Sequence, residues 1–178
     1  MSGIYLGLGS NLGDRVGHLK RALDRLQEHG VACTALSSLY DAAYVGPARV
    51  PQPDFLNCAA QVSTTLEPLD LLAAIRETER LGGRSAAFRR GPRTIDIDLL
   101  LYDDVTLNTP RLILPHPRMW GRAFVMAPLA EIAPEIRSPE GVVVGALASD
   151  LASGGQVIRR VAGPEEILSG SAGGASLV

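Results

Sequence analysis

Two aspartates, Asp96 and Asp98, stand inside an apolar run that is otherwise typical of a buried β-strand. Aspartate is uncommon in strands, so the pair indicates a special role. Because side chains alternate between the two faces of a strand, both carboxylates are expected on one face. The residues expected on the opposite face are Ile95, Ile97, Leu99 and Leu101. At a rise of about 3.3 Å per residue the two aspartate Cα atoms lie about 6.6 Å apart, which suits two divalent cations shared by both side chains.

Magnesium is the natural occupant of such a site, because it prefers carboxylate, phosphate and water oxygens. Four arginines just upstream, Arg84, Arg89, Arg90 and Arg93, place positive charge beside the aspartates. Cations next to a metal-binding acidic pair indicate a polyanionic ligand such as a nucleoside triphosphate. Two simpler interpretations stay open: an edge strand whose polar face meets water, and arginines that form surface salt bridges.

The composition limits the class of protein. The chain has 178 residues, of which 46% are hydrophobic, enough for one domain with a substantial core. A net charge of −2, with Lys20 the only lysine among 17 basic residues, argues against non-specific nucleic-acid binding. Cys33 and Cys58 lack Cys-x-x-Cys spacing and are expected to be reduced core residues. Without an apolar run of about 18 residues or a signal-peptide pattern, we expect a cytoplasmic protein with no membrane contact.

Strand and helix patterns alternate around the aspartate run. The expected elements are strands at 4–8, 32–40, 55–66 and 156–161, helices at 16–26, from Pro68 onward and at 120–131, and loops at 43–54 and 82–93. Several strands follow one another directly, which predicts an α+β, ferredoxin-like α/β sandwich with a mostly antiparallel sheet and helices packed on it. We expect a single domain over residues 1–162 and a flexible, Ser/Gly-rich C-terminal tail over residues 163–178.

Glycines cluster between the first strand and the first helix. Gly7, Gly9 and Gly13 follow the spacing Gly-x-Gly-x-x-x-Gly, one residue longer than the dinucleotide-binding fingerprint. A Walker-type phosphate loop is excluded, because it requires a lysine that the only lysine of the chain cannot supply. Gly9 and Gly13 are instead expected in a tight turn that needs positive φ.

Several strings of the chain together resemble one known family. In chain order they are Gly9-Ser10-Asn11-Leu12-Gly13, Gly46-Pro47, Gln52-Pro53-Asp54-Phe55-Leu56-Asn57, Gly91-Pro92-Arg93-Thr94-Ile95-Asp96-Ile97-Asp98, Pro115-His116 and Arg122-Ala123-Phe124. This set resembles 6-hydroxymethyl-7,8-dihydropterin pyrophosphokinase of folate biosynthesis. The resemblance implies a ferredoxin-like α+β domain that transfers the pyrophosphoryl group of ATP to the hydroxymethyl group of a reduced pterin and releases AMP. It also implies that Asp96 and Asp98 hold two Mg²⁺ ions.

The resemblance assigns roles to individual residues. Catalytic roles fall on Asp96, Asp98, Arg84 and Arg93. ATP contacts fall on Arg76, Glu79, Arg84, Arg93, Leu99, Arg111, Ile113, His116 and Arg122. Pterin contacts fall on Ala43, Val45, Phe55, Asn57 and Phe124. Phe55, Asn57 and Phe124 suit a flat heteroaromatic ligand, since they offer two aromatic faces and an amide that both donates and accepts.

Alternatives stay open for single residues of this set. Phe55 begins an apolar strand, so it could simply pack in the core. Glu79 continues the apolar stripe of the second helix and would need buried partners, so it could orient the arginines without touching substrate.

Two loops depart from the family pattern. Residues 85–90 replace a run that usually contains a second arginine and a tryptophan, which makes Phe88, Arg89 and Arg90 candidates for those duties. Residues 42–44 replace a segment that usually reads Thr-x-Pro. Since such loops close over substrates, we expect both to be mobile without ligand.

Two functions of other classes stay open beside the pyrophosphokinase. One is a two-metal enzyme acting on nucleic acid, which would need a basic groove. The other is a nucleotide-binding module that kept the fold without turnover. We favour the pyrophosphokinase, a monomer acting on the small molecules ATP and reduced pterin without nucleic-acid or membrane partners.

Overall fold

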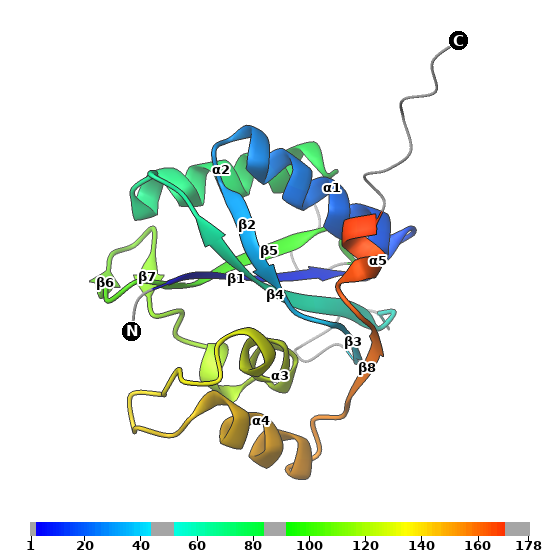
Figure 1. Cartoon of the computed structure of the whole chain (residues 1–178), viewed down its shortest axis with the longest axis vertical. Coiled ribbons are helices and arrows are strands. Elements are labelled where there is room, and N and C mark those ends of the chain that lie inside the picture. Colours follow the sequence, from blue (N-terminus) through cyan, green and yellow to red (C-terminus); the bar gives the residue numbers. More distant parts are fainter. Residues whose placement is uncertain (1–2, 44–51, 84–91, 170–178) are drawn as a thin grey trace.

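An antiparallel sheet forms the centre of the molecule (Figure 1). The computed structural model describes residues 3–43, 52–83 and 92–169. Within these residues the strands follow the order β5-β1-β4-β3-β8, and β2 also pairs with β4. Their bounds are β1 (Ile4–Ser10), β2 (Ala32–Leu36), β3 (Leu39–Ala42), β4 (Phe55–Ser63), β5 (Asp96–Tyr102) and β8 (Ile158–Ala162).

Helices cover both faces of this sheet, so the molecule has three layers (Figure 1). One face lies under α1 (Arg15–Glu28), α2 (Pro68–Leu81) and the short α5 (Glu165–Leu168). The other lies against α3 (Ala123–Ile132) and α4 (Val144–Ser153), preceded by the 3₁₀ helix η1 (Met119–Gly121). A small hairpin of β6 (Leu107–Asn108) and β7 (Ile113–Leu114) follows β5. The α+β class with a mostly antiparallel sheet is confirmed.

The face under α1 and α2, called the α1 face below, is apolar because the strands and helices both present their hydrophobic sides to it. From β1 it receives Ile4, Leu6 and Leu8, none more than 6% exposed. Helix α1 contributes buried residues at spacings of three and four, Leu19, Ala22, Leu23 and Leu26. Its first turn is capped by Asp14, whose carboxylate accepts a hydrogen bond from the Gly17 N–H (2.9 Å).

The opposite face, called the α3 face, holds a second and smaller core. Tyr5 of β1 and Leu100 of β5 pack there with Met126 and Leu129 of α3, each at most 4% exposed. This core lies over only part of the strands, because β1 continues past Tyr5 with Gly7 and Gly9. The end of the α3 face beyond this core carries polar side chains.

The strand predicted over residues 32–40 is wrong in one respect, because the structure divides it into β2 and β3. Both pair with β4, and the break falls at Ser37 and Ser38. The Ser37 hydroxyl accepts a hydrogen bond from the Ala59 N–H (2.9 Å), so a side chain takes over where the regular ladder is interrupted. The periodicity of the sequence cannot show that a side-chain hydrogen bond replaces a backbone one at this point.

The expected alternation along β5 holds up to Leu99 and then fails. The register with β1 shifts between Tyr5 and Leu6, which face Leu101 and Leu99, so Leu100 is an extra residue. Leu101 therefore packs against the core of the α3 face, not the α1 face as predicted. The shift lies beyond Asp98 and leaves the two aspartates on one face.

Three further expectations are corrected by the fold. Gly13 has the expected positive φ of 57°, but Gly9 lies within β1 without one. Helix α4 is absent from the predicted elements, because its ten residues include a glycine and two serines, which have low helix propensity. In the predicted tail, residues 165–168 form α5, and Ile167 is 2% exposed in the core of the α1 face. Residues 170–178 of that tail lie outside the described residues.

The two cysteines are free thiols, with Cys58 buried and Cys33 half-buried. Burial raises the pKa of the Cys58 thiol to about 12, so it behaves as an apolar core residue. None of the helices described is both long enough and apolar enough to cross a bilayer.

Candidate functional site

Asp96 and Asp98 lie side by side on the polar end of the α3 face, as the alternation predicts. Across the sheet, Asp96 faces Gly9 and Asp98 faces Gly7 on β1, while Gly9 also faces Asn57 on β4. The two glycines place no side chain between the carboxylates of β5 and the amide of β4. The aspartate side chains are 27% and 37% exposed, so they meet solvent and stay out of both cores.

Basic side chains surround both carboxylates. Arg93 Nη1 lies 2.7 Å from Asp96 Oδ2. Arg122 Nη1 lies 3.5 Å from Asp98 Oδ2, and His116 Nε2 lies 3.9 Å from Asp98 Oδ1. These five residues are called the charged cluster below. Three separate segments bring them together: the start of β5, the turn before η1 and the residue before α3.

His116 faces the cluster as a neutral imidazole that donates from Nε2. The Arg118 backbone N–H donates to Nδ1 (3.2 Å), which assigns the ring proton to Nε2, the nitrogen on the Asp98 side. Burial lowers the pKa of His116, and nearby Arg122 and Arg118 lower it further against the opposing effect of Asp98. The backbone N–H of His116 donates to the Leu100 carbonyl (2.8 Å), which fixes the backbone of His116 to β5.

Glu79 supports the strand between the two aspartates from the outer edge of the sheet. It lies on α2 and is only 5% exposed. Its Oε1 accepts a hydrogen bond from the Ile97 N–H (2.9 Å). The carboxylate thus satisfies a backbone group of an edge strand and holds the segment that carries Asp96 and Asp98. The structure thus places the Glu79 carboxylate against the backbone of β5.

Asn11 is a site residue to which the sequence reasoning gave no role. Its Oδ1 accepts from the Arg93 N–H (2.6 Å), and its own N–H donates to the Arg93 carbonyl (3.0 Å). Its Nδ2 also donates to Gln52 Oε1 and to the Pro53 carbonyl, both at 3.2 Å. Asn11 therefore ties the end of β1 to Arg93 and to the segment before β4. Its place in the Gly-Ser-Asn string was the available signal.

An amide and two aromatic rings flank the charged cluster. The buried Asn57 donates from Nδ2 to the carbonyls of Phe55 (3.1 Å) and Tyr40 (3.4 Å). Its Oδ1 points toward Gly9, where an added Cβ would lie only 3.0 Å away. Phe55 is half-buried at the start of β4, so it is not part of the core. Arg122 lies over the Phe124 ring, 5.5 Å from its centroid, which connects the cluster to the aromatic group.

The remaining predicted residues lie elsewhere or outside the described part. The Leu99 side chain is buried in the core of the α1 face, so it points away from the charged cluster. Arg76, Arg111, Ile113 and Ala43 are exposed on α2, the β6–β7 turn, β7 and the end of β3. Arg84, Val45, Phe88, Arg89 and Arg90 lie outside the described residues.

The carboxylates of the charged cluster form a pair rather than a complete metal cage. Among the described residues no group of three or more His, Cys, Asp or Glu side chains is placed to bind one ion. A pair fits Mg²⁺ that completes its octahedron with water and ligand phosphates, which is the usual arrangement in nucleotide-binding sites. The donor set of Asp96 and Asp98 therefore suits a metal–nucleotide complex.

Most of the chain matches one protein family. Residues 5–134 match the family model of 7,8-dihydro-6-hydroxymethylpterin-pyrophosphokinase (HPPK). A 2-amino-4-hydroxy-6-hydroxymethyldihydropteridine pyrophosphokinase of Bacillus subtilis is 44% identical over 133 residues, 74% of this chain and 78% of the relative. The protein of the same name from Pseudomonas aeruginosa is 45% identical over 141 residues, 78% of this chain and 85% of the relative.

A solved structure shares the fold. A crystal structure of the Plasmodium falciparum HPPK-DHPS protein with pteroate has a TM-score of 0.66 at 17% identity. The match covers 84% of this chain but only 42% of that one, so this chain spans less than half of the HPPK-DHPS protein. At this identity the likeness concerns the fold alone.

Proposed function

We propose, from the premise that the chain belongs to the 7,8-dihydro-6-hydroxymethylpterin-pyrophosphokinase family, that the charged cluster and the neighbouring amide and aromatic groups form its active site. The family membership makes the chain an ATP-dependent pyrophosphokinase, a transferase of folate biosynthesis. ATP is the co-substrate and the reduced hydroxymethylpterin is the acceptor. The main support for this site is that Asp96, Gly9 and Asn57 lie side by side on the neighbouring strands β5, β1 and β4.

The carboxylates of Asp96 and Asp98 would hold Mg²⁺ together with the phosphates of ATP. The bound ions would neutralise phosphate charge and orient the acceptor hydroxyl for in-line attack. Before ATP binds, Arg93 and Arg122 compensate the two carboxylates. When ATP binds, we infer that these guanidinium groups move to phosphate oxygens, which they contact in pairs of parallel hydrogen bonds.

His116 would bind the phosphates of ATP, and Asn57 would bind the pterin. His116 presents an Nε2–H donor that can hold a phosphate oxygen without adding a full charge. Asn57 would present its Oδ1 acceptor to the pterin, because its Nδ2 donates to the Phe55 and Tyr40 carbonyls, and Phe55 and Phe124 would offer ring faces for stacking. In the transfer, the hydroxymethyl oxygen forms a bond to the β-phosphorus and its proton is released to solvent, while the bond from that phosphorus to the α,β-bridging oxygen breaks and AMP leaves.

The family resemblance adds further residues to the proposed site. Those that would contact ATP are Arg76, Arg84, Leu99, Arg111 and Ile113. Those that would contact the pterin are Ala43 and Val45. We further propose that one domain, residues 1–162 together with the packed helix α5, carries the whole reaction. It would act as a monomer in the cytoplasm on small molecules and not on nucleic acid, in line with the net charge of −2. Sedimentation at working concentration would test the monomer.

The identity of the nucleotide product tests the proposed reaction. The protein is incubated with Mg²⁺, ATP and 6-hydroxymethyl-7,8-dihydropterin, and the nucleotides are separated. We expect AMP in a one-to-one ratio with pyrophosphorylated pterin, and no AMP from Asp96→Ala or Asp98→Ala. ADP as the product would contradict pyrophosphoryl transfer, and full activity of both variants would contradict the role of the charged cluster.

A further inference from the structure

The side chain of Gln156 holds the backbone on both sides of Arg122. Its Oε1 accepts a hydrogen bond from the Ala123 N–H (3.0 Å), and its Nε2 donates to the Gly121 carbonyl (3.0 Å). Ala123 and Gly121 are the two neighbours of Arg122 in the chain. Gln156 lies outside residues 5–134, the part of the chain that the family model matches.

The start of α3 needs such a partner because its N-cap residue is Arg122. The first N–H groups of a helix have no carbonyl partner within the helix, and Ser, Thr, Asp or Asn usually supplies one from the N-cap position. Arg122 makes no side-chain cap bond there and directs its guanidinium to Asp98 and the Phe124 ring. Gln156 supplies an acceptor for one of these N–H groups, that of Ala123 in the first turn, from a distant segment.

The end of α4 brings Gln156 to this place. Gly155 has a left-handed φ of 98°, and its N–H donates to the Ala152 carbonyl (3.1 Å). The Gln156 N–H donates to the Leu151 carbonyl (3.1 Å), so the two bonds form a Schellman motif at the C-terminus of α4. Leu151 in turn packs against the core of the α3 face. The backbone of Gln156 is thereby fixed against the same core that carries α3.

We propose that Gln156 is a positioning residue for pyrophosphoryl transfer and acts through Arg122. By bonding both flanking peptide groups, it fixes the backbone from which the Arg122 guanidinium reaches Asp98 and the phosphates. The segment after α4 thus helps to position a residue of the charged cluster through the two peptide groups that flank it. This inference rests on the proposed function of Arg122.

Gln156→Met tests the inference, since methionine has similar length and volume but forms neither hydrogen bond. We expect the single-turnover rate of transfer to fall about tenfold, with KM for the pterin changed less than about twofold. Gln156→Asn is the second variant: it stays polar but is too short to reach both groups, and we expect the same loss. Gln27→Met is the matched control, because Gln27 is exposed on α1, and we expect wild-type rates.

A double-mutant cycle with Arg122→Met separates positioning from a merely structural role. If Gln156 acts through Arg122, Gln156→Met lowers the rate in the wild-type background and causes no further loss beside Arg122→Met. All rates are measured at a temperature where every variant is fully folded. An equal loss in both backgrounds, or a wild-type rate for folded Gln156→Met and Gln156→Asn, would overturn the inference. Absence of AMP from the wild-type protein would instead contradict the proposed function.

Discussion

The two faces of the sheet use the same strands for different purposes. Along β1, Ile4, Leu6 and Leu8 on the α1 face are apolar and buried, and only the terminal Ser10 on this face is polar. On the α3 face the residues of β1 become smaller, from Tyr5 to Gly7 and Gly9, while their partners on β5 become acidic. Packing therefore continues over the whole α1 face but stops partway along the α3 face.

This difference shows where the fold leaves room for chemistry. Carboxylates and arginines are costly inside an apolar core, whereas beside a glycine-lined strand they keep access to solvent and ligand. The α1 face should therefore govern the free energy of unfolding, and the polar end of the α3 face should govern the reaction. Substitutions on the two faces test this division.

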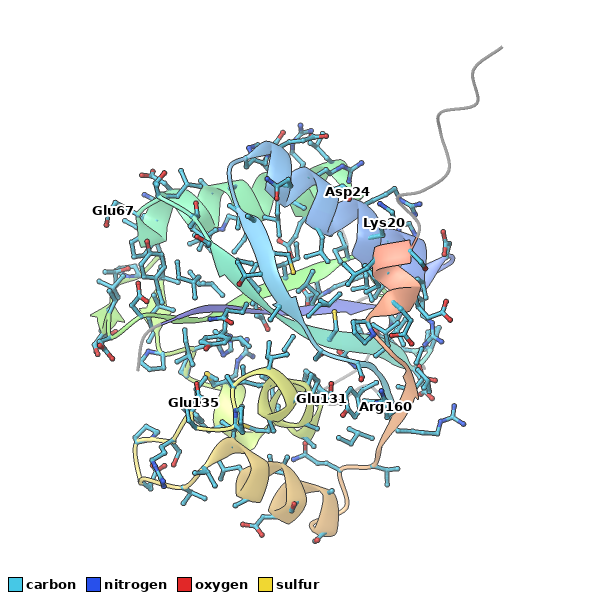
Figure 2. The ribbon with its side chains drawn as sticks, in the orientation of Figure 1. Lys20, Asp24, Glu67, Glu131, Glu135 and Arg160 are labelled. Atoms are coloured by element: carbon cyan, nitrogen blue, oxygen red, sulfur yellow. The ribbon has the colours of Figure 1, made fainter. Side chains whose placement is uncertain are left out.

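The largest effect is expected from the double variant Asp96→Asn with Asp98→Asn. Loss of both metal-binding carboxylates should lower kcat by at least about 1000-fold, which corresponds to about 4 kcal/mol of transition-state stabilisation. Tm should change by only a few degrees, because both side chains are partly exposed. Asp24→Asn, the same change on the surface of α1, should leave kcat unchanged (Figure 2). A double variant that fails to fold would show that the aspartates are structural.

Leu6→Ala tests whether the α1 face governs stability without affecting the reaction. Leu6 is fully buried in the core of the α1 face, so its truncation should lower the free energy of unfolding by about 2–5 kcal/mol. The measurement is urea unfolding, followed by kcat at a temperature where the variant is folded. We expect an unchanged kcat. A large loss of kcat in the folded variant would mean that the two faces are not independent.

Substitutions of Gly7 and Gly9 on β1 test which part of the α3 face binds the pterin. A Cβ at Gly9 would lie 3.0 Å from Asn57 Oδ1 and 3.3 Å from Phe55 Cδ1. The atoms nearest to a Cβ at Gly7 belong to the Leu100 side chain, at an ordinary 3.5 Å. Gly9→Ala should therefore raise KM for the pterin by roughly tenfold, and Gly7→Ala should raise it less. Equal effects on KM would argue against a pterin pocket beside Gly9.

The smallest effect is expected at the margin of the α3 face, where Glu131 joins α3 to two strands (Figure 2). Its carboxylate accepts from the Ser38 N–H (2.7 Å) and the Tyr40 hydroxyl (2.5 Å) and lies 3.7 Å from Arg160 Nε. Burial raises the pKa of Glu131, but these partners outweigh burial and hold it below its usual value. Tyr40 responds in the opposite direction, with its pKa raised to about 12 by burial and by Glu131.

A lowered pKa of Glu131 in the folded state has a defined consequence for stability. The ionised Glu131 carboxylate stabilises the folded state at any pH above the pKa of about 4.3 that it has in the unfolded chain. This stabilisation is lost as the pH falls through its lower pKa in the folded state. Wild-type protein should therefore exceed Glu131→Gln in stability at neutral pH, by less than about 1 kcal/mol because solvent screens the partly exposed group. The difference should shrink below about pH 4. Unfolding curves at several pH values check this, and a pH-independent difference would contradict it.

Much of the site could be predicted from the sequence because its signals are local. The period of two put both aspartates on one face, and the helical period placed Glu79 on the inner side of α2. The resemblance brought in His116, Arg122 and Asn57, which fold next to them.

The remaining features depend on contacts between distant segments. The extra residue Leu100 shifts the register of β5, and neither this shift nor the break at Ser37 alters the hydrophobic pattern enough to be seen. The bridge from Gln156 to the peptides around Arg122 joins segments more than 30 residues apart. Asn11 lies within the Gly-Ser-Asn string, but its bonds to Arg93 form only when β1 and β5 pair.

Metal binding by Asp96 and Asp98 is tested most directly by anomalous scattering from a crystal grown with Mn²⁺ in place of Mg²⁺, a non-hydrolysable ATP analogue and the pterin. We expect anomalous peaks between the triphosphate and the carboxylates of Asp96 and Asp98, with Arg93 and Arg122 turned to phosphate oxygens. Peaks elsewhere, or carboxylates still paired with the two arginines beside a bound triphosphate, would contradict this expectation.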